Sequence, residues 1–181
     1  MLKRHIKNKI LLNVVETIIA LAIALAVFFL AFNYVARTGT VGGVSMEPTL
    51  RHGEWVFINR LAYKLGKPKL GDIIAFPHPS GGERLLIKRV IGVAGDTVDY
   101  FGGYVFLNGA ELPEEYRMEP GGGHTVAFPL TVPEGTIFVL GDNRSLSEDS
   151  RYLEVGCVDL KTVIGKVPFR LFPLNKIGPL H

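Results

Sequence analysis

The pattern of apolar and polar positions divides the chain into two unequal parts. Ile18–Phe32 is an unbroken apolar run, and the wider stretch Val14–Val35 adds only Glu16, Thr17 and Asn33 as polar side chains, all near its ends. As a helix, the wider stretch is about 33 Å long at 1.5 Å per residue. This length is enough to cross the hydrocarbon core of a membrane, which is about 30 Å thick. The pattern therefore predicts a single transmembrane helix over about residues 14–35.

From residue 38 onward the apolar residues come in short runs, many of them alternating with polar residues, and Gly and Pro separate the runs. This pattern is typical of β-strands joined by turns, and it predicts a mainly β domain, a barrel or a sandwich. Asn108-Gly109 predicts a two-residue hairpin turn, and Ala62–Leu65 is expected to form one helical turn. The expected strands are Gly39–Val44, Trp55–Asn59, Ile73–Phe76, Leu85–Val93, Thr97–Tyr100, Tyr104–Leu107, Thr125–Phe128, Thr136–Leu140 and Val163–Phe169.

The positive charge of the chain is concentrated before the apolar run. Residues 1–36 carry Lys3, Arg4, Lys7 and Lys9 against one acidic side chain, so the whole net charge of +3 belongs to them. The positive-inside rule then predicts a single-pass protein of the cell membrane, with a cytoplasmic N-terminus and with residues 37–181 outside the cytoplasm. Residues 37–181 are neutral overall, which argues against a nucleic-acid partner.

Two other interpretations of the apolar run stay open. It could be a secretory signal that is cleaved off, although the bulky Phe28, Phe29 and Phe32 are unusual before a cleavage site and no A-x-A sequence follows. It could also be a buried helix of a soluble protein. We favour the retained anchor, which makes the lipid bilayer an expected partner.

No metal site, cofactor or disulfide is predicted. The five histidines are scattered along the chain without a pair spaced four residues apart, and Cys157 is the single cysteine. Because Cys157 lies among apolar neighbours, we interpret it as a structural thiol.

Two segments rich in polar groups follow predicted strands. Residues 42–50 place Ser45 behind two glycines, which allow the backbone to approach a ligand closely. Residues 141–151 are dense in hydrogen-bonding groups that could fix the position of a neighbouring amine. Each segment alone also fits an ordinary solvated turn.

A third segment, Leu85–Gly92, is an apolar strand pattern that Lys88 and Arg89 interrupt. Successive side chains on a strand point to opposite faces, so one of these two cations is expected to face apolar surroundings. Burial lowers the pKa of a lysine, and a neutral amine can act as a general base. The alternative is an edge-strand lysine whose amine reaches water.

Four motifs occur in one order behind the predicted anchor: S-M-x-P-T at 45–49, G-D-I-x-x-F at 71–76, K-R-x-x-G-x-x-G-D at 88–96 and G-D-N-R-x-x-S-x-D-S-R at 141–151. In this order they resemble the type I signal peptidases, the membrane-anchored serine proteases that remove signal peptides from exported proteins. The chain is most similar in pattern to the small Gram-positive members. The resemblance implies an antiparallel β-sheet or barrel catalytic domain behind a transmembrane helix.

The resemblance also implies roles for particular residues. Ser45 is the expected nucleophile and Lys88 the expected general base of a Ser–Lys dyad. Ser147 is expected to hydrogen-bond the Lys88 amine, and Asp149 and Arg151 are expected to form a supporting ion pair.

Further residues are implied to bind the substrate. Val41, Met46, Leu50 and Leu86 would line the pocket for the residue before the cut, and Ile74, Ala75 and Ile87 would line the pocket two residues upstream. The Ser45 N–H would be one oxyanion donor. Many relatives have a serine two residues before the nucleophile as the second donor, whereas this chain has Gly43, so its second donor stays unassigned. The motif at 141–151 also departs from the usual pattern at Ser145, where Asp is common.

The implied function is removal of signal peptides from exported preproteins after A-x-A, through an acyl-enzyme and without a cofactor. The expected partners are these preproteins, the lipid bilayer and the protein export machinery. Residues 99–133, between the third and fourth motifs, are expected to form a small β insertion. The alternatives are a conjugation-pilus maturation peptidase of the same superfamily and an inactive membrane-anchored scaffold. The self-cleaving repressors, which share the dyad, have a DNA-binding domain where this chain has its apolar run.

Overall fold

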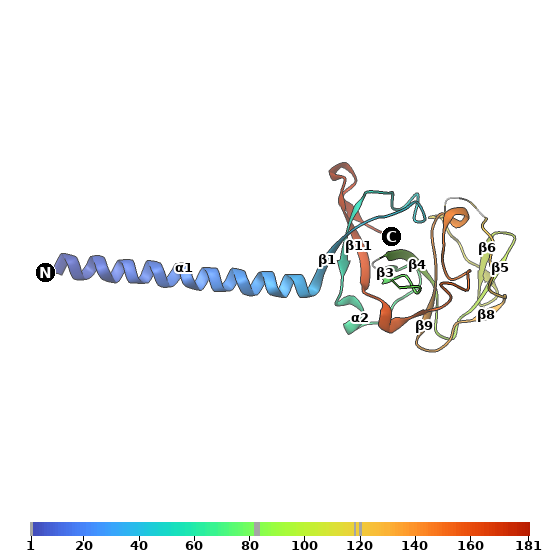
Figure 1. Cartoon of the computed structure of the whole chain (residues 1–181), viewed down its shortest axis with the longest axis horizontal. Coiled ribbons are helices and arrows are strands. Elements are labelled where there is room, and N and C mark those ends of the chain that lie inside the picture. The colour runs from blue at the N-terminus through green and yellow to red at the C-terminus, as the bar shows by residue number, and fades with distance from the viewer. Residues whose placement is uncertain (1, 82–83, 118, 120) are drawn as a thin grey trace. The chain divides into compact units, whose positions relative to one another are not determined.

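The computed structural model describes residues 2–81, 84–117, 119 and 121–181, and its contacts divide the chain into two units, Met1–Val35 and Ala36–His181 (Figure 1). The first unit is the helix α1 (Leu2–Val35). Its segment Leu12–Leu30 has 19 residues with a mean hydropathy of 2.4. At 1.5 Å per residue this segment is about 28 Å long, so the helix is long and apolar enough to cross a membrane.

The second unit is built from antiparallel strands joined by turns and short helical segments. Its strands are β1 (Ala36–Thr40), β2 (Trp55–Asn59), β3 (Ile73–Pro77), β4 (Leu85–Val93), β5 (Thr97–Phe101), β6 (Tyr104–Leu107), β7 (Ala110–Glu111), β8 (Leu130–Thr131), β9 (Thr136–Leu140), β10 (Val158–Asp159), β11 (Gly165–Phe172) and β12 (Gly178–Pro179). Its helical segments are α2 (Ala62–Leu65) and 3₁₀ turns at Arg144–Leu146, Leu160–Thr162 and Leu174–Lys176.

The strands form two antiparallel sheets. The larger sheet has the order β1-β2-β11-β3-β4-β9-β10, with β12 paired to β11, and the smaller sheet has the order β7-β6-β5-β8. Figure 1 shows β5, β6 and β8 together at one end of the second unit, beside β9. The fold class is therefore mainly antiparallel β, as the sequence predicts. The strands of the smaller sheet lie within residues 97–131, and the sequence predicts a small β insertion over residues 99–133.

The strands next to the site are buried on both faces. On β3, Ile73 and Ala75 pack into one apolar cluster with Leu50 and Met46, whereas Ile74 packs into a second cluster on the opposite face. A third cluster joins the end of β4 and β9 to the smaller sheet. Since alternate residues of a strand point to opposite faces, the continuous apolar character of these strands reflects packing on both sides.

Most of the predicted strands lie at the predicted places, and Asn108-Gly109 connects β6 to β7 with both residues at positive φ. This is the geometry of a type I′ hairpin turn. The prediction for Gly39–Val44 has the wrong boundaries, because β1 starts at Ala36 and ends at Thr40. The strand pairs along its whole length with β2, whose first residue, Trp55, lies opposite Thr40. The partner strand therefore sets the end of β1.

The prediction of a strand at Thr125–Phe128 is wrong. The backbone N–H groups of Thr125 and Val126 both donate to the carbonyl of Arg151, so they take no part in a sheet ladder. Phe128 instead packs its ring against Phe138 at a centroid distance of 6.0 Å. The last predicted strand is also displaced, because β11 runs over Gly165–Phe172. The short strands β7, β8, β10 and β12 were not predicted, since two residues show no periodicity.

Candidate active site

Ser45 lies in a turn that follows the end of β1, after a short segment that contains two glycines. The turn is closed by a hydrogen bond from the Leu50 N–H to the Met46 carbonyl at 2.7 Å, and both of these side chains are buried. The N–H of Asn143 donates to the Ser45 carbonyl at 3.0 Å. The loop after β9 therefore holds the main chain of Ser45 in place.

Lys88 lies on β4 with only 2% of its surface exposed, and its Nζ is 2.6 Å from Ser45 Oγ. Burial lowers the pKa of Lys88 from 10.5 to about 8, and the carboxylate of Asp149 partly opposes this change. Arg84 and Glu148 make smaller contributions of opposite sign. The amine is therefore neutral in a useful fraction of molecules near neutral pH, within hydrogen-bonding distance of a hydroxyl.

Ser45 and Lys88 line a cleft of about 750 Å³. Most of the other lining residues belong to β1, to the segment after β1 and to the first half of β4. The predicted site residues that line it are Val41, Gly43, Ser45, Met46, Ala75, Leu86, Ile87 and Lys88. Residues on distant parts of the sequence thus meet around one opening, which is the size of a binding site for part of a peptide.

The structure does not support two of the predicted substrate contacts. Leu50 and Ile74 have no exposed surface and do not line the cleft. Leu50 packs behind Met46 in the first apolar cluster, and Ile74 points to the opposite face of β3 from Ala75. Both residues support the walls of the cleft from within the core.

Ser147 lies beside the candidate dyad but does not make the predicted contact. Its Oγ is buried and has no hydrogen-bond partner among the described residues. The hydroxyl lies against Gly141, where an added Cβ would collide with both Ser147 Oγ and the Ser45 carbonyl. Gly141 is therefore required by close packing, and Ser147 keeps an unused polar group in the site.

Asp149 and Arg151 form the expected ion pair, and both are fully buried. Arg151 Nε donates to one carboxylate oxygen at 2.8 Å and Nη2 donates to the other at 2.9 Å. The Gly141 N–H also donates to Asp149, at 3.1 Å. This bidentate pair fixes the loop on both sides of Ser147.

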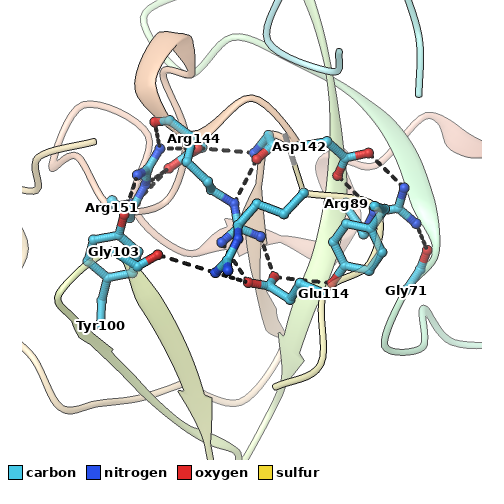
Figure 2. Close-up of polar contacts among 12 residues, drawn as sticks. Gly71, Arg89, Tyr100, Gly103, Glu114, Asp142, Arg144 and Arg151 are labelled. Carbon is cyan, nitrogen blue, oxygen red and sulfur yellow. Dashed lines mark hydrogen bonds and ion pairs between the residues drawn. The ribbon is translucent and has the colours of Figure 1, made fainter. Parts of the chain in front are cut away.

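The sequence left open whether Lys88 or Arg89 is buried, and the structure buries both. Arg89 is 1% exposed and forms a bidentate pair with Asp142, with Nε to Oδ1 at 2.8 Å and Nη2 to Oδ2 at 2.7 Å. The ring of Tyr116 covers its guanidinium at 3.8 Å, and Thr49 Oγ1 donates to Asp142 at 2.6 Å. Figure 2 shows this group of buried polar contacts.

Several residues that line the cleft were not predicted from the sequence. Arg37, Arg84, Leu146 and Glu148 line it, and Leu146 is 65% exposed. His78 Nε2 lies 2.9 Å from Glu148 Oε1, and this contact lowers the pKa of Glu148. No sequence signal identifies these residues, because they lie at ends of strands and in a turn, where periodicity is lost.

Comparisons with known proteins identify the family of the chain. The family model described as signal peptidase, peptidase S26, matches residues 14–172. The chain belongs to this signal peptidase family. Signal peptidase IB of Staphylococcus aureus is 34% identical over 180 residues, which cover 91% of this chain and 92% of that protein. A probable signal peptidase I-1 of Synechocystis sp. is 36% identical over 172 residues, covering 91% of this chain and 86% of that protein.

A solved structure of a signal peptidase I from Enterococcus faecalis is also similar. It is 40% identical, with a TM-score of 0.48, and covers 56% of this chain and 97% of that chain. Membership of the signal peptidase family makes the chain a protease of the serine class. The apolar helix α1 fits the membrane anchor of such an enzyme.

Proposed function

We propose that this signal peptidase removes N-terminal signal peptides from exported preproteins, cutting after small residues of the A-x-A type through an acyl-enzyme. Ser45 is the nucleophile and Lys88 is the general base. The observation that carries the proposal is the 2.6 Å contact between Lys88 Nζ and Ser45 Oγ at a cleft. Family membership and the lowered pKa of Lys88 support it.

The reaction begins when the neutral Lys88 amine takes the Ser45 proton as Oγ attacks the scissile carbonyl. The Ser45 N–H has no hydrogen-bond acceptor among the described residues, so it is free to donate to the oxyanion that forms. The resulting ammonium then gives its proton to the leaving amine, which departs and leaves an ester on Ser45. The same amine next activates a water molecule, which hydrolyses the ester.

The substrate lies extended between two free strand edges. β1 is the edge strand of the larger sheet, and β4 pairs with β9 only from Arg89 onward. The segment Leu85–Lys88 therefore has backbone groups without a strand partner on one side, among the described residues. A peptide can add to such edges through its main chain. Val41, Met46 and Leu86 then bound a small pocket, which favours alanine before the cut.

Charge and connectivity support a single-pass topology with the catalytic unit outside the cytoplasm. The basic residues precede α1, and β1 starts directly after α1. By the positive-inside rule the N-terminus is cytoplasmic. The lipid bilayer is thus one partner, and the export machinery delivers the preproteins to the same side of the membrane.

The test is cleavage of a purified preprotein with an A-x-A site by the full chain in detergent, with the cut mapped by mass spectrometry. We expect the wild type to cut after A-x-A, and Ser45→Ala and Lys88→Ala each to lose at least about 10³-fold in kcat. Ser145→Ala is the matched control, because this exposed serine lies in the neighbouring loop and makes no hydrogen bond among the described residues. Normal cleavage by folded Ser45→Ala would rule out the dyad.

A further inference from the structure

The two motifs at 88–96 and 141–151 contain three buried arginines, Arg89, Arg144 and Arg151, and each is 1% exposed or less. They lie on β4 and in the loop after β9, and each contacts one side chain of the insertion that contains the smaller sheet. The pairs are Arg89 with Tyr116, Arg144 with Glu114, and Arg151 with Tyr100. The insertion therefore contacts the motif residues by specific polar and cation–π interactions (Figure 2).

The contact of Glu114 with Arg144 is the most enclosed of the three. The side chain of Glu114 is 1% exposed and that of Arg144 is fully buried. Arg144 Nη1 donates to Oε2 at 2.9 Å, and Nη2 donates to Oε1. Arg117 and Tyr116 also donate to the same carboxylate, at 3.4 and 3.2 Å. Such a bidentate pair fixes the orientation of the guanidinium as well as its position.

The third nitrogen of Arg144 connects this pair to the site. Arg144 Nε donates to the Gly141 carbonyl at 2.9 Å. Gly141 packs so tightly against the Ser45 carbonyl and Ser147 that a Cβ would collide with both. Two residues later, the Asn143 N–H holds the same Ser45 carbonyl. A shift of Gly141 would therefore move the main chain of Ser45.

We propose that Glu114 is a positioning residue of the proposed protease: it orients Arg144, and Arg144 fixes the Gly141 backbone against which Ser45 rests. The proposal rests on Ser45 being the nucleophile, as proposed above. The largest charge effects on the pKa of Lys88 come from Asp149, Arg84, Glu148 and Arg151. Glu114 is not one of these groups, and its contact with Arg144, which donates to the Gly141 carbonyl, indicates an effect on geometry.

The variant Glu114→Gln keeps the shape of the side chain and removes its charge. Its matched control is Glu115→Gln, because Glu115 is the exposed neighbour and has no partner among the described residues. A double variant, Glu114→Met with Arg144→Met, removes the buried pair as a unit. Replacing a buried ion pair by apolar residues is often neutral or stabilising. Arg117, the second cation on the Glu114 carboxylate, is partly exposed and keeps its contact with the Tyr104 ring. The double variant also removes the donor to the Gly141 carbonyl.

The experiment uses each full-chain variant in detergent. It measures the melting temperature and the fraction of molecules that a penem inhibitor labels at Ser45. It also measures KM and the kcat per labelled molecule for cleavage of an A-x-A preprotein. For Glu114→Gln we expect a melting temperature lower by about 10 °C. We expect kcat per labelled molecule to fall at least about tenfold, with KM within twofold, because a small displacement of a reacting group is costly. Glu115→Gln should match the wild type.

The double variant separates positioning from stability. We expect its melting temperature to return toward that of the wild type while kcat per labelled molecule stays about tenfold low. Recovery of kcat in the double variant, or an unchanged kcat per labelled molecule in Glu114→Gln, would overturn the positioning role and leave Glu114 as a structural residue. If Glu114→Gln does not fold, the double variant decides alone. Absence of cleavage by the wild type would instead overturn the proposed function itself, which the same assay reveals before any variant is compared.

Discussion

Replacing the buried Lys88 with Met should make the protein more stable and inactive at neutral pH. Burial lowers the pKa of Lys88 from 10.5 to about 8. This difference means that the protonated lysine destabilises the folded state by about 3 kcal/mol. At pH 7 the lysine is largely protonated in both the folded and the unfolded state, so the folded state bears that full cost. Met has a similar length and no charge. The lost hydrogen bond to Ser45 costs about 1 kcal/mol. The free energy of unfolding of Lys88→Met should therefore exceed that of the wild type by about 2 kcal/mol.

The pH dependence of this gain tests its cause. Between pH 8 and 10.5 the folded wild type loses the proton that the unfolded chain keeps, so the free energy of unfolding of the wild type rises with pH. The advantage of Lys88→Met should therefore shrink across this range and reverse by about 1 kcal/mol above it. The assay is urea unfolding of the full chain in detergent, read by pulse proteolysis at pH 7, 8, 9 and 10. A variant that is less stable at pH 7, or a difference that is independent of pH, would refute the reasoning.

Two further predictions concern the rate of cleavage. With a base of pKa about 8, kcat/KM of the wild type should rise roughly tenfold from pH 7 to pH 9 and level off above pH 9, because the neutral fraction of Lys88 rises from about 9% to about 90%; a rate that is flat from pH 6 to 9 would contradict a titrating lysine base. Gly43→Ser should fold like the wild type, since no atom lies within 4 Å of a Cβ added at Gly43, and it should raise kcat several-fold by supplying a second oxyanion donor. An unchanged kcat with parental stability would indicate that this donor is already present elsewhere.

Local signals in the sequence predict much of the fold. Trp55–Asn59, Leu85–Val93, Tyr104–Leu107 and Thr136–Leu140 are strands in the structure with the predicted bounds. Each is a run of apolar or alternating residues that ends at a turn or a glycine, so side-chain burial and turn chemistry agree. Where they disagree, as at Thr125–Phe128, the pattern of apolar residues reflects packing of individual rings and not a sheet ladder.

The candidate site was predicted less completely, for reasons of geometry. Ile74 and Ala75 are neighbours on one strand, so only one of them can face the cleft, and this one is Ala75. Leu86 and Ile87 are also neighbours, yet both line the cleft, because this half of β4 presents its free edge to the opening. Which edge is free depends on where β9 begins to pair. That pairing is a long-range property, and no local pattern encodes it.

The burial of β4 explains both the lowered pKa of Lys88 and the ion pairs of the buried arginines. Burial lowers the pKa of a lysine toward neutral pH, and Lys88 is buried because both faces of β4 are covered. Covering both faces also buries Arg89 beside Lys88, and an arginine stays charged when buried. Each buried arginine therefore requires a partner, and Asp142, Glu114 and Asp149 supply the carboxylates. The ion pairs of Arg89, Arg144 and Arg151 are therefore a consequence of the same burial that lowers the pKa of Lys88. In the proposed enzyme, the geometry of these pairs would position Ser45.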